Sequence, residues 1–434
     1  MRQRRNHVIP LPAGVDDVEK LNLHTNNSHP SLSTIFIFCL VTRIINSLLV
    51  QTYFNPDEHW QAPEVAHRIA FGYGHLTWEW NKGIRSYLHP VIFAALYKVL
   101  ALSHLDNSWF MIRAPRLLQS VFSAIGDLYL YKYSKALFVI PIGGLVLGFT
   151  LLLDCQLYGS WVMVPLNFVK FNFLSSGGDY YGTHAWHWYI TQGFTIMLFT
   201  YIPFSIAGII MSKEWKLSGL IIWVLGVYSL LGHKEFRFVL PVLPIALIFS
   251  GIPLANLHQR KMSKRKQIRN SRKNHYSRLH MSVIFLLVTN LPMALYMSMV
   301  HQRGAEDVMN YLSKEARDNK VKSILFLTPC HATPYYSTLH QNISMRFLDC
   351  TPSEERGNLD ESDQFLQDPL AFVKTLARNW TPPSHIVLFD SQEKPLKDFL
   401  VSHKFDEMKR FFHAHFKVDR ELQGSIVVYK SREQ

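Results

Sequence analysis

Cysteine is scarce in this chain, which has four among its 434 residues: Cys39, Cys155, Cys330 and Cys350. No two of them stand at the spacing of a structural zinc site, and we expect no bound metal. Cys330 and Cys350 lie in a polar tail, where they could pair or stay free depending on which compartment that tail faces. Repeats of solenoid length and low-complexity tracts are also missing, so a repeat architecture is excluded.

Acidic residues are missing from "HQRKMSKRKQIRNSRKNHYSRLH" at 258–280, which carries nine Lys or Arg. The net charge of +13 could suit a nucleic-acid binder, but this charge is concentrated between two apolar runs. An excess of Lys and Arg in such a loop is typical of the cytoplasmic side of a membrane protein. We therefore interpret 258–280 as a cytoplasmic loop and expect no nucleic-acid partner.

Long apolar runs fill residues 31–300, and runs of about 20 apolar residues are the length that crosses a bilayer. Residues 1–30 are too long and polar to begin a signal peptide, so we expect a cytoplasmic tail followed by a retained signal anchor. The sequence predicts an α-helical polytopic membrane protein. The expected spans are 31–50, 88–105, 110–131, 136–153, 188–211, 217–232, 236–256 and 281–300.

The expected topology contains a conflict. Counting back from the cytoplasmic loop places the polar loop 154–187 and the tail in the lumen, and counting forward from the N-terminus also places the loop 51–87 there. Two lumenal loops must be joined by an even number of spans, but three lie between them. Either one of the three is re-entrant, or part of the expected fold is absent.

The tail, residues 301–434, has the pattern of a soluble domain. Short apolar runs alternate with amphipathic stretches, which predicts a small lumenal α/β domain. On this topology the sequons at Asn342 and Asn379 are candidates for glycosylation, whereas Asn26 is not. The predicted strands are 322–329, 384–390 and 425–430, and the predicted helices are 368–380 and 395–405.

Two adjacent carboxylates, Asp57 and Glu58, open the stretch "NPDEHWQAPEVAHRIAFGYGHLTWEW" at 55–80. They lie just beyond the first span, where a carboxylate can act as general base on a hydroxyl whose reaction partner is held in lipid. The competing interpretation is that Asp57 caps the following helix. Taken alone, the carboxylates favour the cap.

A second charged cluster, "HKEFRF" at 233–238, stands between two expected spans. Its His233, Lys234 and Arg237 suit a phosphate leaving group, because Arg can bind phosphate with two hydrogen bonds and Lys adds a positive charge. Basic side chains at helix ends also reach routinely for lipid headgroups. That explanation fits a single Lys or Arg better than this whole cluster.

The loop 154–187 is rich in aromatic residues, which stack on sugar rings, and in carboxylates and imidazoles, which bind hydroxyls. An interfacial aromatic belt is the simpler explanation for part of it. In the tail, "PCHATPYYSTLH" (329–340) could line a pocket or could be a packing element. The candidate residues for binding sugar or acceptor are Trp78, Trp80, Asp154, His184, Trp186 and His187.

These stretches together resemble the dolichyl-phosphate-mannose-dependent mannosyltransferases, and among them the members that build the glycosylphosphatidylinositol (GPI) anchor. The resemblance covers residues 35–430 and is carried by the motifs above together with "LNFVKFN" (166–172), "GTHAWHWYITQGF" (182–194) and "HQRG" (301–304).

The resemblance implies a type C glycosyltransferase in the endoplasmic reticulum membrane. It further implies an inverting α-1,2-mannosyl transfer from dolichyl phosphate mannose to a dimannosylated GPI precursor, with no cofactor. In that chemistry Asp57 would be the base and Glu58 its partner. His233, Lys234 and Arg237 would hold the departing dolichyl phosphate.

One departure from the family is large. Its members are about 120 residues longer, enough for several spans of about 20 residues each. The extra part lies between the segments that match 126–137 and 139–149 here. Three hypotheses follow: an active mannosyltransferase with a rearranged span, a shortened inactive isoform with a binding or regulatory role, and a lipid-linked-sugar transporter.

Overall fold

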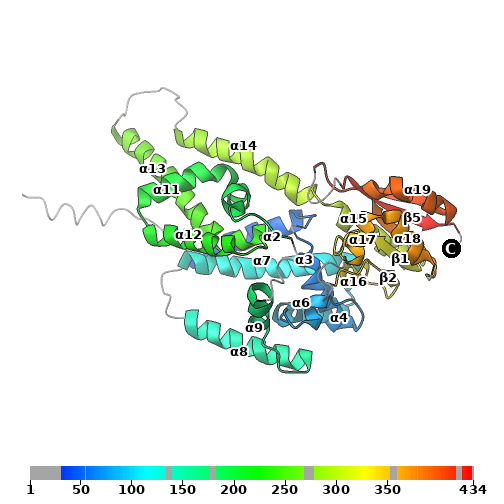
Figure 1. Cartoon of the computed structure of the whole chain (residues 1–434). Helices are drawn as coiled ribbons and strands as arrows, with labels where there is room; N and C mark the ends of the chain where they lie inside the picture. Colours follow the sequence, from blue (N-terminus) through cyan, green and yellow to red (C-terminus); the bar gives the residue numbers. More distant parts are fainter. Residues whose placement is uncertain are drawn as a thin grey trace, which may run out of the picture.

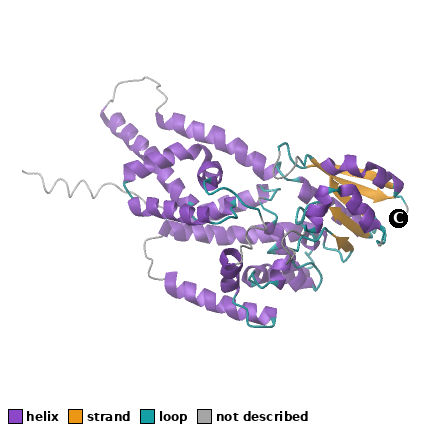
Figure 2. Cartoon of the chain, in the orientation of Figure 1, coloured by secondary structure: helices purple, strands orange, loops and turns teal. Residues whose placement is uncertain are grey.

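Two differently built regions share the chain: helices dominate most of it, and strands are confined to its C-terminal part (Figure 2). The predicted tail 1–30, the centre of the basic loop 258–280 and Asn379 lie outside the residues that the structure describes. The computed structural model describes residues 31–53, 55–132, 139–174, 182–267, 278–351, 359–378, 380–416 and 423–432.

In the described part of the chain, three helical segments are long and apolar enough to cross a membrane: Leu32–Leu49, Tyr189–Ser212 and Arg278–Arg317. Large apolar side chains on the helices point outward, and those of Phe38 and Ile222 are 71% and 73% exposed. Lipid tails are as apolar as these side chains, so such exposure is typical of helices in a bilayer. The chain is a membrane protein.

The helical region begins with one long helix, continues through a loop with short helices and ends in a bundle (Figure 1). Its elements are α2 (Leu32–Leu49), α3 (Asp57–Trp60), α4 (Pro63–Phe71), α5 (Trp78–Asn81), α6 (Leu88–Leu102), α7 (Ser108–Lys132), α8 (Val139–Tyr158), α9 (Val164–Val169), the π-helices η2 (Lys170–Leu174) and η4 (Tyr189–Gly193), α10 (Phe194–Leu198), the 3-10 helix η5 (Phe199–Tyr201), α11 (Ile202–Ser212), α12 (Trp215–Leu230), the 3-10 helix η6 (Phe236–Val239), α13 (Leu243–Gln267) and α14 (Arg278–Met299).

Small residues and paired charges hold the long helices together. Gly208 lets α11 approach α13 so closely that a Cβ there would lie 1.8 Å from the carbonyl oxygen of Phe249. Between α2 and α7, Arg43 and Asp127 form an ion pair with a nitrogen–oxygen distance of 2.7 Å. Charges in such helices are expected to pair, and Arg43 and Asp127 do so between α2 and α7.

Helix α6 coincides with the span predicted at 88–105, and like α12 it is shorter than a typical membrane-crossing helix. At about 1.5 Å per residue, its 15 residues extend about 22 Å, which is shorter than the hydrocarbon core of about 30 Å. Its buried residues, including Phe93 and Tyr97, pack on Ala66 and Ala70 of α4. Helix α6 therefore packs against the polar loop that contains α4.

Counting α6 with the first loop would remove the conflict in the expected topology. With α6 counted in the first loop, that loop extends from residue 51 to 107. Two helices, α7 and α8, would then join it to the loop 154–187, which would bring the two loops to the same side. Helices α4 and α6 indeed lie toward the end of the bundle at which the sheet is found (Figure 1).

The C-terminal region is a five-stranded sheet with helices on both faces. The strand order is β2-β1-β3-β5-β4, with β1 parallel to both neighbours and β5 antiparallel to both of its own. The elements are α15 (Gly304–Arg317), β1 (Ser323–Leu327), α16 (Tyr336–Leu339), β2 (Ser344–Arg346), α17 (Glu361–Gln367), α18 (Pro369–Ala377), β3 (His385–Phe389), the 3-10 helix η7 (Asp390–Gln392), α19 (Glu393–Ser402), β4 (Phe405–Phe412) and β5 (Ser425–Ser431).

The three predicted strands are β1, β3 and β5, and the two predicted helices correspond to α18 and α19. The sequence analysis does not predict the edge strands β2 and β4. Strand β2 has only three residues, and β4 is "FDEMKRFF", whose side chains are mostly exposed. Charged residues of this kind protect sheet edges from pairing with other chains, and they also hide the strand pattern.

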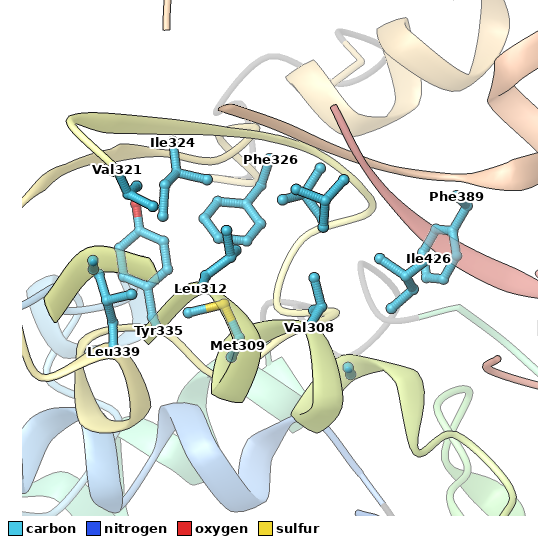
Figure 3. Packing of buried hydrophobic residues seen from close by; sticks show 14 of the residues in the cluster. Val308, Met309, Leu312, Val321, Ile324, Phe326, Tyr335, Leu339, Phe389 and Ile426 are labelled. Carbon is cyan, nitrogen blue, oxygen red and sulfur yellow. The ribbon is translucent and has the colours of Figure 1, made fainter. Parts of the chain in front are cut away.

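Helix α15 covers one face of the sheet and builds its core. Val308 and Leu312, four residues apart on one side of α15, pack on Ile324 and Phe326 of β1, beside Tyr335 (Figure 3). The same cluster includes Tyr53 and Trp60 from the first loop. The core of the C-terminal domain is thus continuous with the loop that carries the predicted catalytic carboxylates.

Candidate active site

The short helix α3 carries both predicted catalytic carboxylates in its first turn. The side-chain oxygen of Asn55 accepts a hydrogen bond from the backbone N–H of Asp57 at 3.0 Å, which fixes the start of the helix. Asp57 is therefore inside the helix and does not cap it, contrary to the simpler interpretation of the sequence. Its carboxylate is available for another partner.

That partner is Arg237, 180 residues away in the "HKEFRF" stretch. The Arg237 Nη1 lies 2.5 Å from the Asp57 Oδ2, and the same guanidinium binds both carboxylate oxygens of Glu235 at 2.5 and 2.6 Å. Burial lowers the pKa of Arg237, but the charges of Asp57 and Glu235 raise that pKa by a larger amount. The net result is a raised pKa. The structure brings together the two motifs that the sequence analysis singled out separately.

His233 and Lys234 are held by the neighbouring loop. The ring of His233 bonds to the Gly182 carbonyl oxygen at 3.1 Å and to Glu235 at 2.7 Å. The buried ammonium of Lys234 donates to the carbonyl oxygens of His184, at 2.9 Å, and Leu231. Both side chains thus fix the "HKEFRF" loop in place, and neither is among the described residues that line the adjacent cavity.

A cavity of about 760 Å³ opens beside the Asp57–Arg237 pair. This is within the range of sites that hold a sizeable organic ligand. Its wall combines Asp57, Glu58 and Arg237 with polar residues from α2, α6, α7 and the segment just before α6. Those further polar residues include Arg43, Asn46, Ser47, Arg85, Ser86, His89, Arg116, Gln119, Ser120 and Ser123.

Each arginine in this wall is paired with a carboxylate. Besides Arg237 with Asp57 and the membrane pair Arg43–Asp127, Arg85 lies 2.5 Å from Glu79, and Arg116 binds Glu306 of α15. Arg116 also donates to the carbonyl oxygen of Val50, where α2 ends, at 2.8 Å. A phosphate entering the cavity therefore meets cations that already have carboxylate partners, and it must compete with them.

The predicted sugar-binding residues of the first loop have different environments. Trp80 is buried in the cavity wall and packs on Tyr87, with ring centroids 4.5 Å apart. Trp78 contacts Phe171. Asp154 is fully buried on α8, where it accepts a hydrogen bond from the backbone N–H of Tyr87 at 2.7 Å. Asp154 therefore secures the start of α6.

The other predicted sugar-binding residues lie in the loop that precedes η4, away from the described cavity wall. His184 stacks on Trp188, with ring centroids 5.0 Å apart, and Trp186 is 68% exposed and contacts His187 edge to face. Asn342 is exposed, as a glycosylated residue must be. The structure does not bring these residues to the Asp57–Arg237 pair.

Cys330 and Cys350 form a disulfide, with Cα atoms 6.1 Å apart. Together with Asp360 they are a group in the described residues that is compact enough to hold a metal. Because the two sulfurs are bonded to each other, they are not thiolate ligands, and the group is better explained as a disulfide beside a carboxylate.

Two residues of the site were missed by sequence reasoning. Glu306 follows the "HQRG" motif, and Arg116 lies inside the apolar run predicted to span at 110–131. The signal for Arg116 was its position inside an apolar helix. No local pattern connects it to Glu306, because the two are 190 residues apart.

The model of the Alg9-like mannosyltransferase family matches residues 34–151 and 134–340. The chain belongs to this family. Mannosyltransferase APTG1 of Arabidopsis thaliana is 55% identical, with 91% of each chain covered. The mouse GPI alpha-1,2-mannosyltransferase 3 is 34% identical over 91% of this chain and 88% of its own. The Yarrowia lipolytica GPI mannosyltransferase 3 is 31% identical over 94% and 99%. No solved structure matches.

As an Alg9-like mannosyltransferase, the chain is a glycosyltransferase, and these relatives favour the enzyme over the transporter hypothesis. The alignment with the Arabidopsis relative has 503 positions, which exceeds the 434 residues of the chain. At least 69 positions of that alignment, the difference between the two lengths, thus have no residue here. The two family matches overlap at 134–151, close to where the resemblance places a missing segment.

Proposed function

We propose that this mannosyltransferase moves mannose from dolichyl phosphate mannose to a dimannosylated GPI precursor, forming an α-1,2 linkage in the endoplasmic reticulum membrane. The names of the mouse and Yarrowia relatives support the acceptor and the linkage. The cavity supports a glycolipid substrate, since it is walled both by polar residues of the first loop and by the helices α2 and α7.

The proposal places the active site and the C-terminal domain in the lumen, as in a type C glycosyltransferase. Three observations support this side. The Cys330–Cys350 disulfide suits an oxidising compartment. The basic loop 258–280 suits the opposite side of the membrane. With α6 counted in the first loop, the 51–107 loop, the 154–187 loop, "HKEFRF" and the C-terminal domain all reach one side.

The observation that carries the proposal is the contact between Asp57 and Arg237 beside the cavity. In the transfer, Asp57 takes the proton of the acceptor hydroxyl while that oxygen bonds to C1 of mannose. The bond between C1 and the phosphate oxygen breaks, and its electron pair leaves with dolichyl phosphate. Arg237 stabilises the added negative charge. No metal is needed in this scheme, because a side-chain cation supplies the charge.

The same contact sets a condition on the reaction. In an inverting displacement the base and the leaving group act on opposite faces of the sugar, and in inverting glycosidases the two catalytic groups stand about 6.5–9.5 Å apart. Asp57 and Arg237, 2.5 Å apart, leave no room for a mannosyl ring. The donor phosphate therefore displaces Asp57 from Arg237, which frees the carboxylate to act as base. Glu58 lines the same wall and is its neighbour in this role.

Complementation tests the proposal. The chain is expressed in cells that lack the third GPI mannosyltransferase, and GPI-anchored proteins are counted at the cell surface. Membranes from the same cells are then given either dolichyl phosphate mannose, or the nucleotide sugar while the synthesis of dolichyl phosphate mannose is blocked. Surface display should return, and transfer should require the lipid-linked donor. Transfer from the nucleotide sugar alone would contradict the donor assignment.

The shortened inactive isoform is the second candidate, and the gap in the alignment favours it. The same cells separate the two candidates, because an inactive chain is produced without restoring surface display. Topology is tested with Asn342, which is exposed. Glycosidase-sensitive modification that disappears in Asn342→Gln supports a lumenal domain, whereas modification at Asn26 would reverse the topology.

A further inference from the structure

One surface of the C-terminal domain is built against the first loop. Residues 332–340, here called the docking segment, follow β1 and include α16. The hydroxyl of Tyr53 donates to the carbonyl oxygen of Ala332 at 3.0 Å. The indole N–H of Trp60 donates to the carbonyl oxygen of Thr333 at 2.9 Å. The first loop therefore binds the backbone of the docking segment both before α3 and at the last residue of α3.

Glu64, on α4, makes the densest set of these contacts. Its Oε1 accepts hydrogen bonds from the backbone N–H groups of Tyr335 and Ser337 at 2.7 and 3.1 Å, and from the Ser337 hydroxyl at 2.5 Å. The side chain is fully buried. A buried carboxylate is costly unless its oxygens are satisfied, and here one short backbone turn satisfies them.

The contacts reach the proposed active site directly. Asp57 stands between Tyr53 and Trp60 in the sequence, so the chain on either side of it is tied to the docking segment. Helix α4 follows α3 after only two residues. The docking segment also contributes Thr338 to the wall of the cavity that Asp57 lines. A shift of the docking segment would therefore change both the cavity and the placement of the base.

We propose that Glu64 is a positioning residue: by binding the docking segment, it fixes the C-terminal domain against α3 and α4 and so holds Asp57 in place for mannosyl transfer. The role of Asp57 in this statement rests on the proposed function. The contact between Glu64 and Ser337 consists of hydrogen bonds that the side-chain amide oxygen of a glutamine can also accept. The C-terminal domain is then part of the catalytic machinery and not an independent appendage.

The experiment compares Glu64→Ala, Glu64→Gln and Ser337→Ala in the full chain, purified in detergent, with Asp318→Ala as control. Asp318 is an exposed residue of the same domain. Because a displacement of about 1 Å can cost about 100-fold in rate, we expect Glu64→Ala to lower kcat by ~10- to 100-fold. The KM for dolichyl phosphate mannose should change little. Glu64→Gln should recover most of the loss, and Ser337→Ala should lose less than Glu64→Ala.

A purely structural role predicts something else. In that case Glu64→Ala lowers the amount of folded protein, while kcat per folded molecule stays at the wild-type value, and this result overturns the proposal. Wild-type kcat at normal protein level in Glu64→Ala overturns it equally. Failure of the proposed function is recognised separately, because Asp57→Asn would then be as active as the wild type, whatever Glu64→Ala does.

Discussion

Asp57 and Glu64 are two carboxylates seven residues apart on one loop, and they are held by opposite means. Asp57 keeps 27% of its side chain exposed, borders a cavity and is bound by a cation. Glu64 is fully buried and bound by neutral backbone and hydroxyl donors. A partly exposed ion pair can separate when a charged substrate arrives and binds one of its two members. A buried carboxylate that is held by backbone donors meets no such competing ligand. The first arrangement suits chemistry and the second suits positioning.

The largest effect is expected from Asp57→Asn, which removes the carboxylate that faces the cavity. The amide keeps the shape but takes up no proton, and general bases contribute about 10²–10⁴ in rate, so we expect transfer to fall by at least 100-fold. Thermal stability should hardly change, because the residue is partly exposed. Transfer by purified variants and their melting temperatures are measured together, with Glu58→Gln alongside. If Glu58→Gln loses more than Asp57→Asn, then Glu58 is the base.

Arg237 tests the cationic side of the same pair. Removing a preorganised donor to a developing anion typically costs about 10²–10³ in kcat, so Arg237→Gln should lose that much. Arg237→Lys keeps the charge but loses the paired contact to Glu235, so it should fall between the wild type and Arg237→Gln. Lys216→Met is the control, because Lys216 is an exposed lysine on α12 that lies outside this loop. Equal losses in Arg237→Gln and Arg237→Lys would contradict a charge-based role.

Glu306 extends the comparison to a buried ion pair. Its side chain is 8% exposed and is bound by Arg116 of α7. Removing one member of such a pair leaves an uncompensated charge and typically costs about 3–5 kcal/mol, so Glu306→Leu should be strongly destabilised. The double variant Glu306→Leu with Arg116→Leu should regain much of that loss. Unfolding in detergent is measured for all three, and an additive double variant would show that the two residues do not interact.

The sequence was most informative where the chemistry is local. The apolar runs, the strands β1, β3 and β5, and the charged motifs containing Asp57 and Arg237 each have a pattern within a few residues. Membrane-length hydrophobicity alone does not decide whether α6 is a span, because a helix packed on α4 and a short span have the same composition. The difference lies in what its buried face touches, which the sequence does not display.

The candidate site shows the same limit. That Asp57 and Arg237 belong together could be expected from the family resemblance, which gives both motifs a role in one reaction. The sequence could not predict that three candidate site residues hold loops in place: Lys234, His233 and Asp154. A lysine that binds carbonyl oxygens and a lysine that binds phosphate have the same appearance in a sequence. The role of Glu64 could not be predicted either, because its hydrogen-bond partners are more than 270 residues away in the sequence.

The smallest expected effect is a pH dependence of stability that can be assigned to Glu64 and not to the titratable groups around it. Burial raises the pKa of Glu64 from 4.5 to about 7, even though the bonds from Ser337 and Tyr335 lower it. The folded protein then binds this proton more tightly than the unfolded chain does. The contribution of Glu64 to stability is therefore largest below pH 4.5, declines as the pH rises to about 7, and is constant above that.

Histidines nearby act in the opposite direction, and the comparison with Glu64→Gln removes them. Burial lowers the pKa of His67 and His75 to about 4, so their contributions are lost as the pH falls from 6.5 toward 4. Both proteins contain these histidines, and their effect cancels in the difference. Melting temperatures at pH 5, 6, 7 and 8 should show the wild type losing stability relative to Glu64→Gln as the pH rises, with no further change above about pH 7. If the difference in melting temperature between the two proteins stays constant between pH 5 and 7, then Glu64 keeps its ordinary pKa and its donors hold it as an ionised carboxylate.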